Sequence, residues 1–213
     1  MLHASTPIVF VVDEDPSVRA SLEQLVCTAG WQPETFATAY DFLDRPRSNV
    51  PCCLVVNLTL PGLNGLELQE RIAHGRRDLP IIFLADKCDL WMVVKAMKGG
   101  ALEFLTKPYD REAILNAIRY AIKRSEAALG RENELQALRS GYGSLTPRER
   151  EVMTLVVSGL LNKQVGGELG ISEITVKIHR GNVMRKMNAG SLAALVNMAS
   201  RLHVNQPLLS GAA

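Results

Sequence analysis

Short apolar runs alternate with helical patterns along residues 8–125, and this alternation limits the possible folds more than any other feature of the sequence. The apolar runs are four or five residues long, and the segments between them carry apolar residues at spacings of three and four. Near-continuous apolar strands separated by amphipathic helices are typical of a parallel sheet that is covered on both faces. The expected strands are residues 8–12, 32–36, 53–57, 80–84 and 102–105, and the expected helices are residues 16–30, 39–45, 65–75, 89–100 and 110–125. The pattern therefore predicts an α/β domain with five β/α units.

The helical pattern continues beyond this region and is interrupted only by Gly130. We therefore interpret residues 126–143 as a helical linker between two domains, residues 1–125 and residues 144–213. The leucines of the linker are compatible with a short coiled coil formed with a second chain, and equally with a solvated spacer.

Strand patterns stop after residue 144, and four helical segments follow. Thr146, Pro147 and Glu149 have the spacing of a capping box with a proline at the first position of the helix. The expected helices are residues 145–160, 162–170, 173–187 and 191–202. The sequence therefore predicts that the second domain is small and all-α.

Basic residues are concentrated in the C-terminal part of the chain. Residues 1–139 contain 16 Lys and Arg against 18 Asp and Glu, whereas residues 140–213 contain 8 against 4. This distribution indicates a nucleic-acid partner for the second domain. The apolar runs are far shorter than the roughly 20 residues that cross a bilayer, and the N-terminus does not have the pattern of a secretory signal. We expect a cytoplasmic protein without membrane contact.

Polar residues stand at the carboxyl ends of the expected strands. The first strand is followed by Asp13 and Glu14, the third ends at Asn57, the fourth is followed by Asp86, and the fifth is followed closely by Lys107. Ligands of an open parallel sheet bind outside these strand ends, so we expect the five side chains to converge. Carboxylates there would suit Mg²⁺, and a lysine would suit an anion such as a phosphoryl group.

Five stretches of sequence carry a resemblance to a known family. They are VVDEDPSVR, NLTLPGLNG and FLTKP in the first domain, and LTPREREV and ISEITVKIHR in the second. In this order and spacing they resemble a two-component response regulator of the NarL/FixJ family, over nearly the whole chain. The resemblance implies a flavodoxin-like (βα)5 receiver domain with a five-stranded parallel sheet, followed by a LuxR-type helix-turn-helix domain that binds double-stranded DNA.

The resemblance also implies roles for residues at the sheet edge. In such receivers an aspartate ending the third strand accepts a phosphoryl group from a sensor kinase, and an acidic pair on the first strand holds Mg²⁺. A hydroxyl residue after the fourth strand binds a phosphoryl oxygen, and a lysine after the fifth neutralises charge. By position, Asn57 stands at the acceptor, Asp13 and Glu14 form the acidic pair, Ala85 stands at the hydroxyl position, and Lys107 is the lysine.

Two of these positions lack the group that the chemistry needs. The amide of Asn57 cannot form an acyl phosphate, and Ala85 has no hydroxyl. With one carboxylate fewer, Asp13 and Glu14 are expected to bind Mg²⁺ only weakly, and no cofactor is expected to be required. Lys107 is expected to pair with the acidic residues or with Asn57 rather than to bind an anion. A laboratory exchange would also explain Asn57, but the second loss at Ala85 favours a natural receiver released from phosphorylation.

The expected helix 173–187 carries the candidates for DNA contact. In a helix-turn-helix the second helix enters the major groove, and the helix before it braces across the backbone. Lys177 is the main candidate for base contact, followed by Arg180, with Thr175 on the same exposed face. Phosphate contacts are expected from Lys163, His179, Arg185 and Lys186. The residues expected in the core are Ile174, Val176, Val183 and Met187.

Glycines distinguish this domain from the usual pattern of the family that it resembles. Gly166 and Gly167 stand in the bracing helix, where alanine is common, at a cost of about 0.5–1 kcal/mol per glycine in helix propensity. Gly181 lies inside the expected reading helix. We therefore expect an unusual affinity or sequence preference.

The last expected helix has an apolar face formed by Leu192, Leu195, Val196 and Ala199. The resemblance implies that this face forms a homodimer, although packing onto its own domain would use the same residues.

Three hypotheses for function remain open. The first is a dimeric DNA-binding transcription regulator that acts without phosphorylation, with Trp91 and Cys88 as candidate positions for sensing or docking a partner. The second is a conventional phosphorelay regulator with a substitute acceptor such as Asp13 or Asp15. The third is an adaptor that binds a kinase or another protein. The sequence shows no catalytic constellation, so we do not expect an enzyme.

Overall fold

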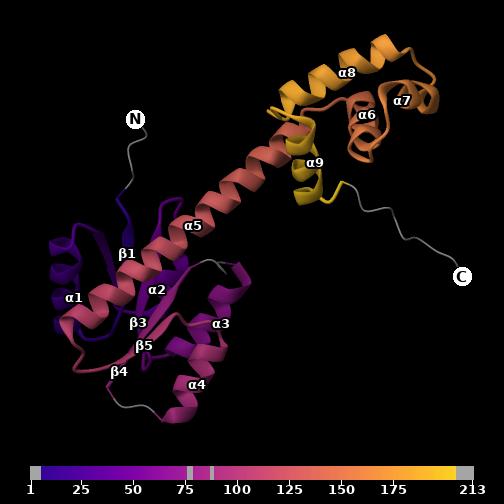
Figure 1. Cartoon of the computed structure of the whole chain (residues 1–213). Helices are drawn as coiled ribbons and strands as arrows, with labels where there is room; N and C mark the ends of the chain where they lie inside the picture. The colour runs from indigo at the N-terminus through magenta and orange to yellow at the C-terminus, as the bar shows by residue number, and fades with distance from the viewer. Residues whose placement is uncertain (1–5, 76–78, 87–88, 205–213) are drawn as a thin grey trace, which may run out of the picture. The chain divides into compact units, whose positions relative to one another are not determined.

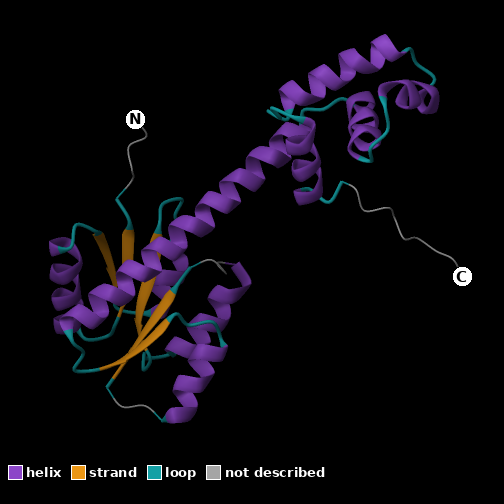
Figure 2. Cartoon of the chain, in the orientation of Figure 1, coloured by secondary structure: helices purple, strands orange, loops and turns teal. Residues whose placement is uncertain are grey.

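The computed structural model describes residues 6–75, 79–86 and 89–204, which divide into two compact units, one up to Gly130 and one from Arg131. Figure 1 labels the helices and strands, and Figure 2 shows that strands occur only in the first unit within the described part of the chain. Each unit has its own hydrophobic core.

The first unit contains a five-stranded parallel sheet with the strand order β2-β1-β3-β4-β5. The strands are β1 (Ile8–Val12), β2 (Gln32–Phe36), β3 (Cys52–Asn57), β4 (Ile81–Ala85) and β5 (Glu103–Thr106). The helices between them are α1 (Pro16–Thr28), α2 (Ala39–Asp44), α3 (Gly65–Gly75) and α4 (Leu90–Lys98), and α5 (Arg111–Gly143) follows the last strand. The predicted β/α alternation is confirmed, with boundaries shifted by one or two residues apart from the end of α5.

Both faces of the sheet are covered by helices, as the continuous apolar strands predict. Val9 and Val11 of β1 pack toward α1 and α5, whereas Ile8, Phe10 and Val12 pack toward α2, α3 and α4. All five residues of β1 are buried, because successive side chains point to opposite faces and each face has its own core. Because all five strands are parallel, their carboxyl ends lie together at one edge of the sheet (Figure 2).

α5 is one continuous helix of 33 residues that includes Gly130 without interruption. The helical conformation predicted for residues 126–143 is therefore confirmed. Leu138 and Tyr142, within this predicted linker, pack against the core of the second unit. The two units divide within α5, so the last turns of this helix belong to the second unit.

In addition to the end of α5, the second unit contains the four short helices that the sequence predicts. These are α6 (Pro147–Val157), α7 (Asn162–Leu169), α8 (Glu173–Lys186) and α9 (Leu192–Arg201). The predicted capping box is present: Glu149 N–H donates to Thr146 Oγ1 over 3.3 Å, and Thr146 N–H donates to Glu149 Oε2 over 2.9 Å. Gly170 ends α7 in the left-handed conformation, with φ +64°, and turns the chain toward α8.

The core positions of α8 differ from the prediction at one residue. Val176, Val183 and Met187 are buried, but Ile174 is 71% exposed, so its predicted place in the core is wrong. Successive residues of a helix are rotated by about 100°, so Ile174 is turned by about 200° from Val176. Ile174 therefore lies on the face opposite to the buried valines.

Candidate functional site

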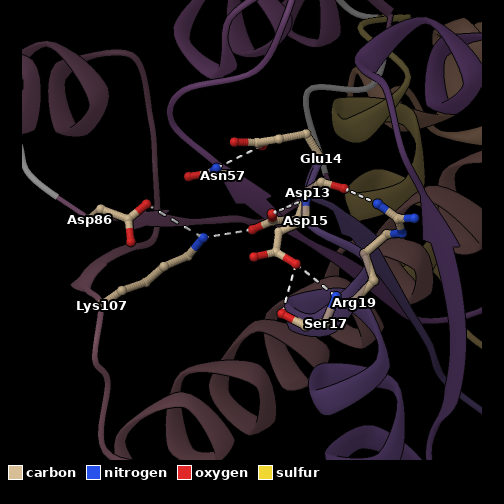
Figure 3. Close-up of polar contacts among 8 residues, drawn as sticks. All are labelled: Asp13, Glu14, Asp15, Ser17, Arg19, Asn57, Asp86 and Lys107. Carbon is tan, nitrogen blue, oxygen red and sulfur yellow. Dashed lines mark hydrogen bonds and ion pairs between the residues drawn. The ribbon is translucent and has the colours of Figure 1, made fainter.

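The carboxyl edge of the sheet brings together polar side chains from four strand ends. Asp13 follows β1, Asn57 ends β3, Asp86 follows β4 and Lys107 follows β5. Figure 3 shows the side chain of Lys107 pointing between Asp13 and Asp86, with Asn57 next to Glu14. The convergence predicted from the strand ends is confirmed.

Lys107 forms a partly buried ion pair with Asp13. Its Nζ donates to Asp13 Oδ2 over 2.8 Å, and Asp13 is only 1% exposed. Asp86 Oδ2 lies 3.8 Å from the same Nζ but is largely exposed. Burial by itself would lower the pKa of Lys107, but the hydrogen bond and charge of Asp13, together with the charges of Asp86 and Glu14, raise it above its usual value. Lys107 is therefore charged and engaged within the molecule.

Asn57 is fully enclosed, with 2% of its surface exposed. Its Nδ2 donates a hydrogen bond to Glu14 Oε2 over 2.9 Å. A carboxylate can only accept, so this contact fixes which end of the amide faces Glu14. Asn57 Oδ1 is buried and has no hydrogen-bond partner among the described residues.

The first helix is anchored to the same edge. Asp15 is the N-cap of α1 and accepts hydrogen bonds from Ser17 N–H over 2.8 Å and from Ser17 Oγ over 2.7 Å. The bond from the Ser17 hydroxyl is the main cause of a lowered pKa of Asp15. Arg19 donates to the backbone carbonyl of Asp13 over 2.7 Å. These contacts hold the acidic segment in place.

Ala85 is buried, and its side chain belongs to the core that β4 shares with α2, α3 and α4. Its carbonyl accepts a hydrogen bond from Lys107 N–H over 2.7 Å, which sets the start of the loop that carries the lysine. Ala85 therefore helps to position Lys107 but offers no side-chain polar atom to a ligand.

The oxygen atoms of this edge do not fit a tightly held Mg²⁺. Asp13 Oδ2 is already bonded to Lys107, and Asp13 Oδ1 accepts a hydrogen bond from Asp15 N–H over 3.0 Å. Glu14 accepts from Asn57, and the described residues contain no group of three or more acidic, histidine or cysteine side chains that could hold a metal ion. A hard cation needs several anionic or carbonyl oxygens, so the weak site at Asp13 and Glu14 stays a prediction.

The predicted base-contacting residues of α8 differ in their availability. Lys177 is exposed and pairs with Glu173 one turn earlier, with 3.2 Å between Nζ and Oε1. Arg180 is partly buried and donates to Asn162 Oδ1 of α7 over 3.1 Å. Thr175 shares a 2.8 Å hydrogen bond with Ser172, the N-cap of α8. Lys177 is thus the most accessible of the three.

The predicted phosphate contacts also fall into different environments. Lys163 and Arg185 are exposed, whereas His179 is partly buried and its Nδ1 has no partner among the described residues. Lys186 donates to Glu149 Oε2 over 2.7 Å and to the Ser144 carbonyl over 3.1 Å. The amino group of Lys186 therefore joins α8 to α6, and this competes with the predicted contact to a phosphate.

Two exposed residues of α8 are not among the candidates that the sequence predicts. The sequence pattern places Ile174 in the core and assigns no role to Ile178, yet both are mostly exposed. Their spacing of four residues, with Val176 between them as the buried residue, is the signal that could have placed them on the outer face.

Models of two protein families match this chain. The model described as "Response regulator receiver domain" matches residues 9–119, and the model described as "Bacterial regulatory proteins, luxR family" matches residues 143–199. Nodulation protein W of Bradyrhizobium diazoefficiens is 44% identical over 204 residues, which cover 95% of this chain and 90% of that protein.

The chain belongs to the response regulators with a LuxR-type DNA-binding domain.

Further relatives agree with this membership. The transcriptional regulatory protein FixJ of Bradyrhizobium diazoefficiens is 37% identical, and the match covers 91% of this response regulator and 94% of that protein. The solved structure of the response regulator StyR has a TM-score of 0.84 and 44% identity, covering 92% of this chain and all of that one. This protein is thus a DNA-binding transcriptional regulator of the response-regulator type.

This response regulator also exposes a large apolar side chain on its first unit. Trp91, at the start of α4, is 65% exposed, and Lys95 Nζ lies 5.6 Å from the centre of its ring. Leu90, Val94 and Met97 of the same helix are exposed as well. Cys88, the other position predicted for sensing or docking, lies outside the described residues.

None of the helices in the described part of the chain has the length and apolar composition that a membrane span requires.

Proposed function

We propose that this response regulator controls transcription without phosphorylation at Asn57. The observation that carries the proposal is a pair of internal contacts at the acceptor position. The Asn57 amide donates a hydrogen bond to Glu14, and Lys107 donates one to Asp13. An amide is not a nucleophile for phosphoryl transfer, and the lysine that would meet a phosphoryl oxygen already has an anionic partner. Ala85 supplies no hydroxyl to bind a phosphoryl group.

DNA binding is assigned to α8, with α7 as the bracing helix. Lys177 contacts bases, and Arg180 and Thr175 support it. Phosphate contacts come from Lys163, His179 and Arg185, with Lys186 as a further candidate once its bond to Glu149 opens. Regulation in this proposal depends on a homodimer formed through α9, or on a sensor kinase or other protein bound to the first unit.

The exposed residues of α9 support the homodimer. Leu195 and Ala199 fill the core of the second unit, whereas Leu192 is 40% and Val196 is 38% exposed. The apolar face predicted for this helix is therefore divided, and the part that its own domain leaves open is available to a second copy.

Phosphodonor treatment tests the proposal. Full-length protein is incubated with acetyl phosphate and Mg²⁺, and then its intact mass and its affinity for promoter DNA are measured. We expect no added phosphoryl mass and no gain in affinity. The Asn57→Asp variant, which places a carboxylate at the same strand end, is the matched control and should gain one phosphoryl mass.

A phosphoryl group on the wild-type protein would overturn the proposal and would indicate a substitute acceptor, which peptide mapping would assign to Asp13, Asp15 or another residue. Of these two, Asp13 is buried against Lys107, whereas Asp15 is exposed. A gain in DNA affinity after treatment would contradict the proposal in the same way.

A second candidate function is that of a protein-binding adaptor, which the exposed apolar face of α4 around Trp91 favours. The two functions make different predictions for Lys177→Ala. Loss of promoter regulation in cells supports the DNA-binding regulator, whereas unchanged cellular activity supports the adaptor.

A further inference from the structure

The outer face of α8 is apolar at its centre. Ile174 is 71% exposed and Ile178 is 60% exposed, and the two lie one turn apart in the first half of the helix. Gly181 continues the same face and would have no heavy atom within 4 Å of an added Cβ. Two large apolar side chains are thus exposed on neighbouring turns of one face of α8.

The polar groups around this surface already have partners. Lys177 pairs with Glu173, so the first turns of α8 carry little net charge on this face. Arg180 is bonded to Asn162, and the hydroxyl of Thr175 is bonded to Ser172. The isoleucine side chains can therefore meet a partner without breaking an internal contact, whereas Lys177 first leaves an exposed pair with Glu173, at little cost.

The major groove offers one apolar group to such a face. Each base edge presents hydrogen-bond donors or acceptors there, and thymine alone adds a methyl group at C5. An isoleucine placed against a thymine methyl removes apolar surface of both from water. Against a guanine or cytosine edge the same side chain would cover polar atoms without giving them a hydrogen bond, which costs free energy.

We propose that Ile174 and Ile178 contact thymine methyl groups in the major groove, so that the operator carries thymines at the positions facing the first two turns of α8. The inference rests on the proposed function, because it requires α8 to enter the major groove. It extends that function by naming the bases and the chemical group that are recognised. In this arrangement Lys177, between the two isoleucines in sequence, contacts the adjacent base pair.

Replacing thymine by deoxyuridine tests the inference, since it removes the methyl group and keeps the base pair. Full-length protein first selects duplexes from a randomised pool. In the best selected duplex, each thymine is then replaced by deoxyuridine, and the dissociation constant is measured for wild type, Ile174→Ala and Ile178→Ala. We expect a loss of about fourfold for wild type at a contacted position, the effect of one buried methyl group.

Each isoleucine variant should bind equally well with thymine or deoxyuridine at the base that the replaced isoleucine contacts. At the base contacted by the remaining isoleucine, deoxyuridine should still weaken binding. Lys177→Ala is the matched control, because it should weaken binding to the selected duplex and keep both deoxyuridine effects. Thermal unfolding of each variant checks that the fold is intact, which we expect because both isoleucines are outside the core.

The outcomes separate the inference from the proposed function. Selection of a duplex that binds tightly, with no deoxyuridine effect at any thymine, would overturn the inference and leave the proposed function standing. Enrichment of no sequence at all would overturn the proposed function and the inference with it. Isoleucine variants that change association with another protein, while their DNA binding equals that of wild type, would show that this face meets a protein and would also overturn the inference.

Discussion

At the scale of single residues, Asn57 has a structural role at the strand end where receivers carry an aspartate. Its amide donates a hydrogen bond to Glu14. An aspartate at the same position would instead place a second carboxylate against Glu14. A neutral donor at this position removes one negative charge from an edge that already contains Asp13, Glu14 and Asp86. Asn57 therefore reduces the repulsion that a complete acidic cluster has to balance with a cation.

The Asn57→Asp variant should be less stable than wild type in the absence of Mg²⁺. The new carboxylate would replace a donor 2.9 Å from Glu14 Oε2 in a buried site, so we expect a loss of about 1–3 kcal/mol in the free energy of unfolding, measured by urea denaturation. Mg²⁺ should recover part of the loss and leave wild type almost unchanged. Asn57→Ala removes the hydrogen bond without adding charge and is the control; equal stability of the Asp variant and wild type without Mg²⁺ would contradict this account.

At the scale of elements, the connection between α7 and α8 depends on one of two adjacent glycines. A Cβ on Gly166 would lie 2.8 Å from the carbonyl oxygen of Ile171, at the turn that leads into α8. A Cβ on Gly167 would meet nothing within 4 Å. The two residues contribute to the same helix, but only Gly166 permits the close approach of the turn.

These contacts predict opposite effects for two alanine variants. Gly167→Ala should raise the free energy of unfolding by about 0.5–1 kcal/mol, because alanine loses less backbone freedom in a helix than glycine does. Gly166→Ala should lower it by about 1–3 kcal/mol, because the turn has to shift. Urea denaturation of both variants measures the difference, and an equal gain from both would show that the turn is not tight.

The contact between α6 and α8 should depend on pH. Hydrogen bonds from Lys186 and from Thr146 N–H lower the pKa of Glu149 below its usual value. A lowered pKa in the folded state stabilises the protein at pH values above the unfolded-state pKa, and this contribution is lost as the pH falls through the folded-state pKa.

Glu149→Gln should therefore cost about 1–3 kcal/mol near pH 7. Its difference from wild type should shrink and disappear as the pH falls through the lowered folded-state pKa of Glu149. Unfolding measured at a series of pH values gives this difference directly. Glu151→Gln is the control, because Glu151 is half exposed and pairs with Arg148 at the surface, so its removal should cost about 0.5 kcal/mol or less. A Glu149→Gln effect that persists in acid would rule out the ion pair as its cause.

At the scale of the whole molecule, the proposed regulation depends on how many copies assemble. α9 leaves Leu192 and Val196 open, and a charge placed there would have to lose its water in a dimer. Val196→Glu should therefore shift the protein toward the monomer and weaken promoter binding at least tenfold, as measured by analytical ultracentrifugation and DNA titration.

Asn197→Glu is the matched control for this prediction. Asn197 is exposed on the same helix but is rotated by about 100° from Val196. Its replacement by glutamate therefore adds the same charge away from the open apolar face. We expect its assembly and promoter binding to equal those of wild type. A Val196→Glu protein that remains a dimer would assign the assembly to another surface.

Much of the fold could be predicted because its signals are local. The five apolar runs, the amphipathic segments between them and the capping box at Thr146 each lie within a few consecutive residues, and the structure confirms all of them. The meeting of Asp13, Asn57 and Lys107 could also be predicted, because the topology of a parallel sheet brings its carboxyl strand ends to one edge.

The two-part architecture and the polar residues at the sheet edge follow from local sequence patterns and from the topology that these patterns imply. The partner of each side chain does not: Lys107 pairs with Asp13 rather than with Asn57, Lys186 pairs with Glu149, and Ile174 lies outside the core. A pairing or an exposed fraction depends on which residues, distant in sequence, occupy the neighbouring space. Helical spacing identifies the faces of α8, but only the packing of α6 and α7 against it selects the face that is buried.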